Sequence, residues 1–211
     1  NEDDIVRATG HRLRIVKALV RDPAKERGFP AADGLLTTNF GDIAGDPSIE
    51  VVAEVMGGVD PARNYLLELF RAGKPVVTAN KHLVAHYGPE LEAASRAGGA
   101  PLRFEAAVAG GIPVLGPLGA DLAANRVARV RGIVNGTTNY ILTAMAREGR
   151  DYGEVLAEAQ ARGYAEADPT ADVEGLDAVN KLVILARLAF GGWIEPAQIA
   201  NRPGTARGGA G

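Results

Sequence analysis

Two side chains of opposite charge, Asp177 and Lys181, lie four residues apart in the stretch GYAEADPTADVEGLDAVNK at residues 163–181. On a helix, four residues leave two side chains about 40° apart on one face, so the carboxylate and the amine can touch. The apolar run after Lys181 favours its neutral amine, whereas Asp177 favours the ammonium form. The pattern indicates either a proton-transferring lysine or a surface ion pair of little consequence for stability.

The loop before this helix is rich in carboxylates, at Glu166, Asp168, Asp172 and Glu174. Several carboxylates close together can bind the ammonium group of a small substrate through charge-assisted hydrogen bonds. The same composition is also typical of a solvated acidic loop, and the residues alone leave both interpretations open.

A second lysine, Lys81, follows Asn80 directly after the apolar stretch at residues 75–79. Proteins built on parallel sheets present functional groups at the carboxyl ends of their strands. Lys81 is therefore a candidate functional residue, with a solvated loop lysine as the alternative.

Glu105 lies inside an apolar stretch at residues 104–108, followed by the sequence AGGIP. A buried carboxylate is costly without a partner, so we expect an arginine or a metal ion beside it. The glycines allow backbone carbonyls to converge, which suits a hard cation with oxygen ligands.

His82 and His86 are also four residues apart, a spacing that two metal ligands on one helix can have, but no third ligand lies nearby in the sequence. We therefore expect both histidines at the surface.

Alternating strands and helices must position these residues. Strands are predicted over residues 13–20, 51–56, 75–79 and 102–108. One helix is predicted to begin at Pro61, with Asp60 as its cap and Gly73 just past its end, and another covers residues 89–97. This alternation predicts crossover connections and one parallel sheet. Its carboxyl ends would lie at Arg21 and at residues 56–58, 79–81 and 109–111.

The pattern changes after residue 112. One more strand is predicted over residues 126–134, followed by helices over 138–147, 152–162 and 173–190. Residues 201–211 contain too few apolar side chains to pack and are expected to be disordered. The fold class is therefore α/β, with a parallel sheet in residues 1–112 and an α+β region in residues 113–200.

Composition excludes several classes of protein. With 211 residues, 46% hydrophobic and 23% charged, the chain can bury a core and is not disordered as a whole. The most apolar stretch, residues 182–194, is interrupted by Arg187, Gly191 and Gly192, which argues against a membrane span. The balance of 23 basic and 26 acidic residues argues against nucleic acid as a partner. The absence of cysteine excludes disulfides and thiolate nucleophiles and fits a cytoplasmic protein.

Four motifs together resemble the homoserine dehydrogenase family. They are VVTANK at residues 76–81, FEAAVAGGIP at 104–113, GIVNGTTNYIL at 132–142 and the acidic stretch at 163–181. The resemblance extends from residue 13 to residue 199. It implies an oxidoreductase that interconverts L-homoserine and L-aspartate 4-semialdehyde with NAD or NADP, in a Rossmann-type fold followed by a substrate and dimerisation domain. A small-molecule substrate and a homodimer are implied as well.

The resemblance also implies roles for the candidate residues. Lys181 would transfer the proton, and Lys81 would reach the reacting oxygen and the nicotinamide end of the cofactor. Glu166 and Asp177 would bind and orient the amino acid, with Asp172 close by. Asn80 and Gly163 would lie near the cofactor. A monovalent cation, sodium or potassium, would be held by Glu105 and by the carbonyl groups of Val108, Gly110 and Ile112.

The chain departs from the family pattern at both ends. Members of the family open with a strand and a Gly-x-Gly-x-x-Gly turn that binds pyrophosphate, and this sequence starts after that turn, with no initiator Met and with acidic first residues. The family also continues beyond residue 199. We therefore expect a fragment that keeps the substrate half of the site and binds nucleotide weakly. Arg21, at a strand end where an acid often binds ribose, favours NADP.

Two alternatives follow from the same residues. A non-catalytic dimerisation or regulatory module could keep the fold without the glycine turn. A different nicotinamide enzyme could act on aspartate-derived semialdehydes, although the lack of cysteine argues against the acylating semialdehyde dehydrogenases, which need a thiolate.

Overall fold

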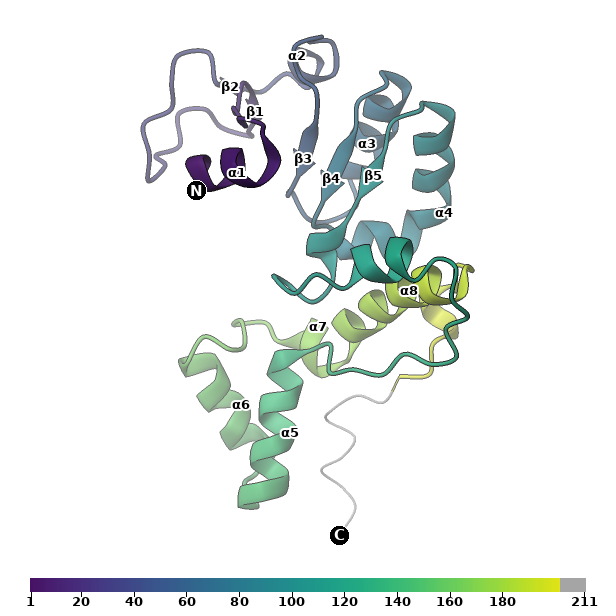
Figure 1. The fold of residues 1–211 in the computed structure, drawn as a ribbon. Helices are drawn as coiled ribbons and strands as arrows, with labels where there is room; N and C mark the ends of the chain where they lie inside the picture. The colour runs from purple at the N-terminus through teal and green to yellow at the C-terminus, as the bar shows by residue number, and fades with distance from the viewer. Residues whose placement is uncertain (202–211) are drawn as a thin grey trace.

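The computed structural model describes residues 1–201, and residues 202–211 of the expected disordered tail lie outside the described part. The first half contains two small parallel sheets (Figure 1). Strand β1 (Ala18–Leu19) pairs with β2 (Leu36–Thr37). Strands β3 (Val52–Glu54), β4 (Val76–Thr78) and β5 (Leu102–Arg103) form the second sheet in that order. Parallel pairing is confirmed, but the expected single sheet is two separate ones.

Helices cover the three-stranded sheet and build the first core. Helix α3 (Ala62–Arg71) and helix α4 (Lys81–Ala97) pack against each other, and α3 contacts β4 while α4 contacts β5. Their fully buried residues include Leu66, Phe70 and Leu83, which lie in one cluster with Val76 of β4. Helix α1 (Glu2–Thr9) and the short helix α2 (Gly41–Ala44) lie on the side of the β1–β2 pair (Figure 1).

The second half is helical within the described residues. Helix α5 (Gly136–Glu148) and helix α6 (Tyr152–Ala161) form a hairpin around Ile141, Val155 and Ala159. The short helix α7 (Thr170–Val173) leads into α8 (Leu176–Phe190), which packs against α4. Two 3-10 helices (Glu105–Ala107 and Pro196–Gln198) and a π-helix (Pro117–Asp121) complete the regular structure.

Several predicted boundaries are wrong. The predicted helix over residues 89–97 begins eight residues earlier, at Lys81, with Pro89 inside it. Pro89 removes one backbone hydrogen bond, but the turns before it bury Leu83 and Val84 completely, and that burial keeps the helix continuous. At α3, Pro61 is the N-cap rather than the first helical residue, because its ψ of 5° is not helical, and Asp60 provides no side-chain cap. The predicted helix over residues 173–190 is divided by Gly175, whose φ of 76° no helix accommodates.

The strands are shorter than predicted. Only Ala18–Leu19 of the predicted strand over residues 13–20 is paired, and the strand over 102–108 ends at Arg103. Phe104 has a φ of −142° and a ψ of 33°, which ends the extended conformation, and a 3-10 helix follows. Residues 126–134 form no strand, since no neighbouring strand within residues 113–201 pairs with them, and Ile133 is 76% exposed.

The contact between α4 and α8 matters most for the site. Val84 of α4 packs in one cluster with Ile184 and Leu185 of α8, and the ring of Trp193 lies directly over Gly88. Figure 1 shows α8 against the lower end of α4. Among the helices within residues 1–201, none combines the length and the apolar character needed to cross a membrane.

We expect the substitution Gly88→Ala to destabilise the protein by about 1–3 kcal/mol, because a Cβ at residue 88 would lie 2.0 Å from the Trp193 ring. Gly153→Ala in α6 is the matched control, since nothing lies within 4 Å of the added methyl group and alanine favours the helix by up to about 1 kcal/mol. Urea unfolding of both variants measures the difference. Equal stability of the two variants would contradict this packing.

Candidate active site

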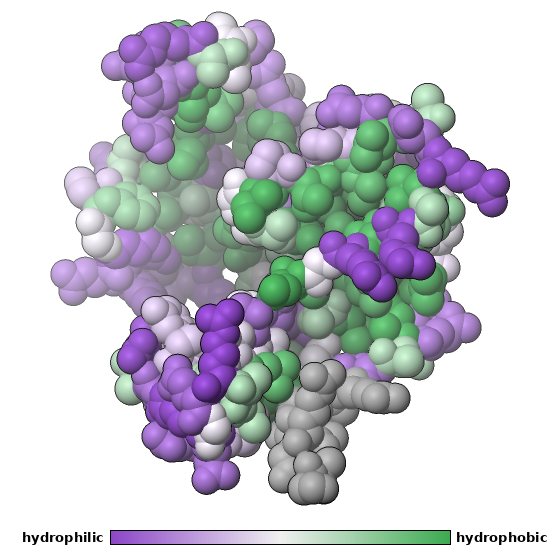
Figure 2. Space-filling model, turned by 60° about the horizontal axis from the view of Figure 1, so that its bottom comes forward, coloured by the Kyte–Doolittle hydropathy of each residue, from purple (hydrophilic) through white to green (hydrophobic). Residues whose placement is uncertain are grey.

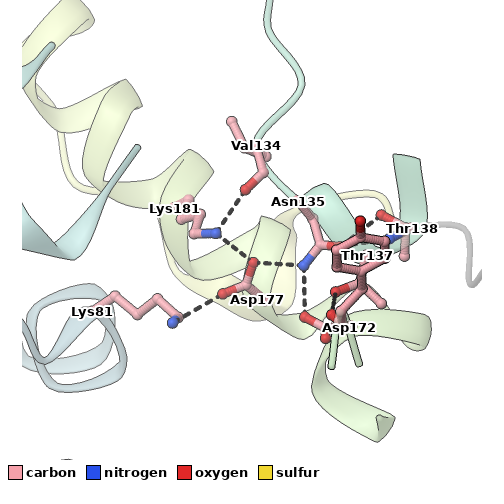
Figure 3. Close-up of polar contacts among 9 residues, drawn as sticks. Lys81, Val134, Asn135, Thr137, Thr138, Asp172, Asp177 and Lys181 are labelled. Carbon is pink, nitrogen blue, oxygen red and sulfur yellow. Dashed lines mark hydrogen bonds and ion pairs between the residues drawn. The ribbon is translucent and has the colours of Figure 1, made fainter. Parts of the chain in front are cut away.

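One carboxylate, that of Asp177, lies between two lysine amines (Figure 3). Its Oδ2 is 2.6 Å from the Nζ atom of Lys181, and its Oδ1 is 3.0 Å from the Nζ atom of Lys81. Lys181 donates a second hydrogen bond, of 2.6 Å, to the carbonyl oxygen of Val134. The sequence predicted the contact between Asp177 and Lys181, and the structure adds Lys81 to it.

Two segments far apart in the sequence position the three charged groups of this cluster. Asp177 and Lys181 lie one turn apart at the start of α8, as their spacing predicted. Lys81 is the first residue of α4, and Ala79 and Asn80 separate it from the carboxyl end of β4. The close packing of α4 on α8 therefore decides whether the two amines reach the same carboxylate.

Burial and hydrogen bonding act on Asp177 in opposite directions. Its side chain is only 8% exposed, whereas that of Lys181 is 17% and that of Lys81 is 40% exposed. Desolvation raises the pKa of Asp177, but the hydrogen bonds from Lys181, Asn135 and Lys81 together outweigh it, so the pKa is lowered. The carboxylate is therefore ionised at neutral pH.

Asn135 is a site residue that the sequence reasoning missed. Its Nδ2 donates to Asp172 Oδ1 at 2.6 Å and to Asp177 Oδ2 at 2.9 Å. Its Oδ1 accepts from the backbone N–H and the hydroxyl group of Thr138, so Asn135 is also the N-cap of α5. An asparagine directly before a predicted helix is a capping signal, but nothing in the sequence reveals the contacts with the two aspartates.

The cluster opens into a hollow of about 540 Å³. Residues from α5, the loop before α7, α7 and α8 line it: Asn135, Gly136, Thr137, Tyr140, Tyr164, Asp172, Asp177 and Lys181. The rings of Tyr140 and Tyr164 meet edge to face at 5.2 Å, and the Thr137 hydroxyl donates to the Tyr164 carbonyl oxygen at 2.7 Å. One side of the hollow is charged and another is aromatic. A small polar molecule fits such a space.

Two residues predicted for this site, Glu166 and Gly163, lie in the loop beside the hollow. Glu166 is exposed, and its carboxylate has no hydrogen-bond partner within residues 1–201. Its backbone carbonyl oxygen accepts a bond of 3.1 Å from the side chain of Gln160. Gly163 has a φ of 74°, which lets the chain turn sharply after α6. The structure therefore brings Asp172 and Asp177 together but leaves Glu166 at the rim.

The other two predicted cofactor residues, Asn80 and Arg21, lie at strand ends. Asn80 is buried, caps α4 by accepting from the Leu83 N–H, and donates a bond of 2.6 Å to the Gly58 carbonyl oxygen. It thereby ties the loop after β3 to the start of α4. Arg21 is exposed beyond the end of β1 and is not among the residues that line the hollow.

Glu105 has backbone partners that the sequence did not predict, and no arginine pairs with it within residues 1–201. Its carboxylate accepts three backbone N–H groups, from Val114 at 2.7 Å, Leu115 at 2.9 Å and Gly116 at 2.7 Å. Desolvation raises the pKa of Glu105, and these three bonds outweigh it, so the pKa is lowered. Of the other predicted cation ligands, Val108 is buried, whereas Gly110 and Ile112 are exposed.

The two histidines of α4 are exposed, as expected. The rings of His82 and His86 lie 4.3 Å apart, and His82 Nδ1 is 3.5 Å from the side-chain nitrogen of Asn180. Within residues 1–201, no three side chains among histidine, aspartate and glutamate converge as metal ligands.

This arrangement suits proton transfer to or from an oxygen atom. Lys181 uses two positions around its nitrogen for Val134 and Asp177, which leaves one position for a proton or a lone pair. Lys81 lies on the other oxygen of the same carboxylate, and two amines near one oxygen atom stabilise negative charge that develops on it.

Comparison with known proteins places the chain in a family. The family model described as homoserine dehydrogenase matches residues 113–204, and the model of the homoserine dehydrogenase NAD-binding domain matches residues 3–105. The homoserine dehydrogenase of Bacillus subtilis is 50% identical over 190 residues, which is 90% of this chain and 44% of that protein. That of Mycobacterium tuberculosis is 49% identical over 89% of this chain and 42% of its own length.

Solved structures agree with these matches. A homoserine dehydrogenase from Thiobacillus denitrificans aligns with a TM-score of 0.87 and 48% identity over 96% of this chain and 47% of that chain. A hyperthermophilic archaeal homoserine dehydrogenase in complex with NADPH aligns with a TM-score of 0.68 and 30% identity over 74% of this chain and 48% of its own. This chain spans less than half the length of these relatives. The chain belongs to the homoserine dehydrogenase family.

Proposed function

We propose that this chain is part of an enzyme that interconverts L-homoserine and L-aspartate 4-semialdehyde with a nicotinamide cofactor. The observation that carries the proposal is the buried Asp177 carboxylate with one lysine amine on each oxygen, at the edge of a polar hollow. Family membership supports it, because relatives with about 50% identity are named homoserine dehydrogenase.

In this proposal Lys181 moves the proton. When the alcohol is oxidised, the amine takes the hydroxyl proton, and in the reverse sense its ammonium form gives a proton to the aldehyde oxygen. The nicotinamide ring, when bound, accepts or supplies the hydride. The Lys181 nitrogen donates one hydrogen bond to the Val134 carbonyl oxygen and one to Asp177. Its third position, which carries a proton or a lone pair, is therefore the one that faces the substrate. Lys81 stabilises the charge on the reacting oxygen.

Carboxylates on the other side of the hollow suit the ammonium group of the amino acid. Asp172 lines the hollow and has no lysine or arginine partner within residues 1–201. A substrate ammonium can therefore supply the charge that its carboxylate lacks. Glu166, exposed at the rim of the same loop, is a second group that can bind it. Asp177 is already paired with two lysines, so we assign it to orienting them rather than to direct contact with the ammonium.

A monovalent cation fits the loop after β5 by the chemistry of the donors. Glu105 Oε2 accepts only one backbone bond, and Ala109 and Gly110 have φ values of 64° and 58°, which turn successive carbonyl groups in a tight loop. The Glu105 carboxylate and the carbonyl groups of Val108, Gly110 and Ile112 would hold sodium or potassium, which prefer such oxygen ligands. The cation would add positive charge that stabilises this loop.

For the cofactor we propose NADP in preference to NAD. Support comes from Arg21, an exposed guanidinium at the carboxyl end of β1, since a guanidinium can bind a 2′-phosphate through two hydrogen bonds. A relative whose structure is described as a complex with NADPH is consistent with it. Lys81 and Gly163 would lie at the nicotinamide end. Asn80 would shape that end through its bond to Gly58.

We also propose that two copies of the chain pair. The support is the set of large apolar residues left exposed in the second half, among them Ile133, Leu182 and Phe190. The face in Figure 2 carries a broad area of hydrophobic residues next to hydrophilic ones. Exposed apolar surface of this kind is typical of protein interfaces.

Replacing the proton-transferring lysine tests the proposed function. In the protein as its gene encodes it, we expect homoserine-dependent reduction of NADP or NAD, and Lys181→Met should lower kcat about 100-fold or more, because the proton loses its acceptor. Lys25→Met, at an exposed lysine far along the sequence from the site, is the control. Turnover of Lys181→Met within a few-fold of the parent removes Lys181 from this role. No reduction of either cofactor by the parent would favour the non-catalytic alternative.

The proposed cofactor preference rests on Arg21. We expect Arg21→Ala to lower kcat/KM for NADP about tenfold or more and to leave that for NAD nearly unchanged, since hydrogen bonds between charged groups contribute about 1.5–3 kcal/mol. Steady-state kinetics with each cofactor measure the effect, and Arg14→Ala, at an exposed position of the same segment, is the control. An equal loss with both cofactors would show that Arg21 does not bind the 2′-phosphate.

A further inference from the structure

Asn135 makes more contacts than capping a helix requires. Because a cap needs only an oxygen acceptor, serine and aspartate cap helices about as well as asparagine does, and threonine caps them less well. Asn135 Oδ1 fills that role for Thr138, and the Nδ2 group remains for other partners. Both of those partners are carboxylates of the site, Asp172 and Asp177. Of the four common capping side chains, only the asparagine amide combines the acceptor with two N–H donors.

The amide holds two like charges close together. Because one nitrogen bonds both carboxylates, at 2.6 and 2.9 Å, the two oxygen atoms lie no more than 5.5 Å apart, the sum of the two bonds. Two carboxylates at this separation repel each other, and only Asp177 has lysine partners within residues 1–201. The amide donates one N–H to each and so stabilises an arrangement that the charges oppose. Figure 3 shows Asn135 between the two aspartates.

Each carboxylate faces a different part of the proposed reaction. Asp177 Oδ2 receives both the Asn135 amide and the Lys181 ammonium, so the amide helps to fix the oxygen that orients the proton-transferring nitrogen. Asp172 lines the hollow and is only partly buried, which leaves its other oxygen available to the substrate. One side chain therefore lies between the groups proposed for proton transfer and for ammonium binding.

We propose that Asn135 is a positioning residue that couples the two carboxylates, so that its amide sets both the orientation of Lys181 through Asp177 and the binding of the substrate ammonium through Asp172. The inference rests on the proposed function for its effect on catalysis. Its structural core, the shared amide, does not depend on which reaction the enzyme performs.

Two substitutions separate this role from capping. Asn135→Ser keeps an oxygen that can cap α5 but is too short to bridge the aspartates, and Asn135→Asp keeps the cap and the shape but replaces both donors by a third carboxylate. We expect both variants to lower kcat and to raise KM for homoserine, each about tenfold or more, with the larger effect in Asn135→Asp. The thermal unfolding of Asn135→Ser should remain close to that of the parent because the cap is kept, whereas Asn135→Asp should unfold at a lower temperature because it adds a third carboxylate beside two others.

Asn139→Ser is the matched control. It makes the same chemical change one turn further along α5, at an exposed side chain, and should leave kcat and KM unchanged. Asp172→Asn is the second comparison, and it should raise KM without an equal fall in kcat, since Asp172 serves only the substrate side. A rise in KM and a fall in kcat together are therefore the signature of Asn135.

A measurement without turnover distinguishes this inference from the proposed function. The charged and polar groups that face Asp177 are Lys181 on α8, Lys81 on α4 and Asn135 before α5, with Asp172 of α7 on the far side of the amide. Losing the Asn135 bond should raise the pKa of Asp177, because that bond stabilises its anion. Carbon-13 NMR titration of the aspartate carboxyl groups in Asn135→Ser should show Asp177 titrating at a higher pH than in the parent.

The outcomes are clear-cut. The inference is supported if Asp177 titrates at a higher pH in Asn135→Ser than in the parent, and if the variants show both a lower kcat and a higher KM. A raised Asp177 titration in Asn135→Ser, together with a parent that does not oxidise homoserine, supports the shared amide and overturns the proposed function. An Asp177 titration that is unchanged in Asn135→Ser, or kinetic constants within about threefold of the parent in both variants, overturns the inference.

Discussion

The Asp177 carboxylate must be both buried and ionised, and the rest of the site follows from that requirement. A buried charge is stable only when charged or hydrogen-bonding partners surround it, and here Lys81, Lys181 and Asn135 supply them from three segments. Because the pKa of Asp177 is lowered, the stability that these contacts provide is present at neutral pH and is lost as the pH falls through that lowered pKa. The same contacts that stabilise the charge hold the Lys181 amine at the edge of the hollow and the Lys81 amine on the other oxygen of the carboxylate.

Packing between α4 and α8 joins the two halves of the chain at this carboxylate. Lys81 follows a strand of the cofactor-binding half, whereas Lys181 belongs to the helical half, and Asp177 contacts both. Trp193 over Gly88 and the cluster around Val84 keep the two helices together further from the site. A change in that packing would separate the amines without altering any residue that lines the hollow. Catalysis in this family member would therefore depend on helix packing as much as on the reactive groups.

Sequence patterns predicted the parts of the site that are local. The spacing of Asp177 and Lys181 placed them on one helical face, and the end of the strand before Lys81 marked that lysine. Contacts between distant segments left no such pattern, so the Asn135 amide and the three backbone partners of Glu105 were not predicted. Strands were predicted too long because alternation of apolar residues does not reveal whether a neighbouring strand is present, as residues 126–134 show. The start of α4 was missed because Pro89 suggested a boundary that the burial of Leu83 and Val84 overrides.

The most direct test of this account is the kcat of Asp177→Asn, measured in the protein as its gene encodes it. Asparagine keeps the size of the side chain and removes its charge, so both amines lose the anion that holds them. We expect kcat for homoserine oxidation to fall about 100-fold or more while the protein remains folded. A variant that is folded and turns over within threefold of the parent would show that the shared carboxylate does not organise the site.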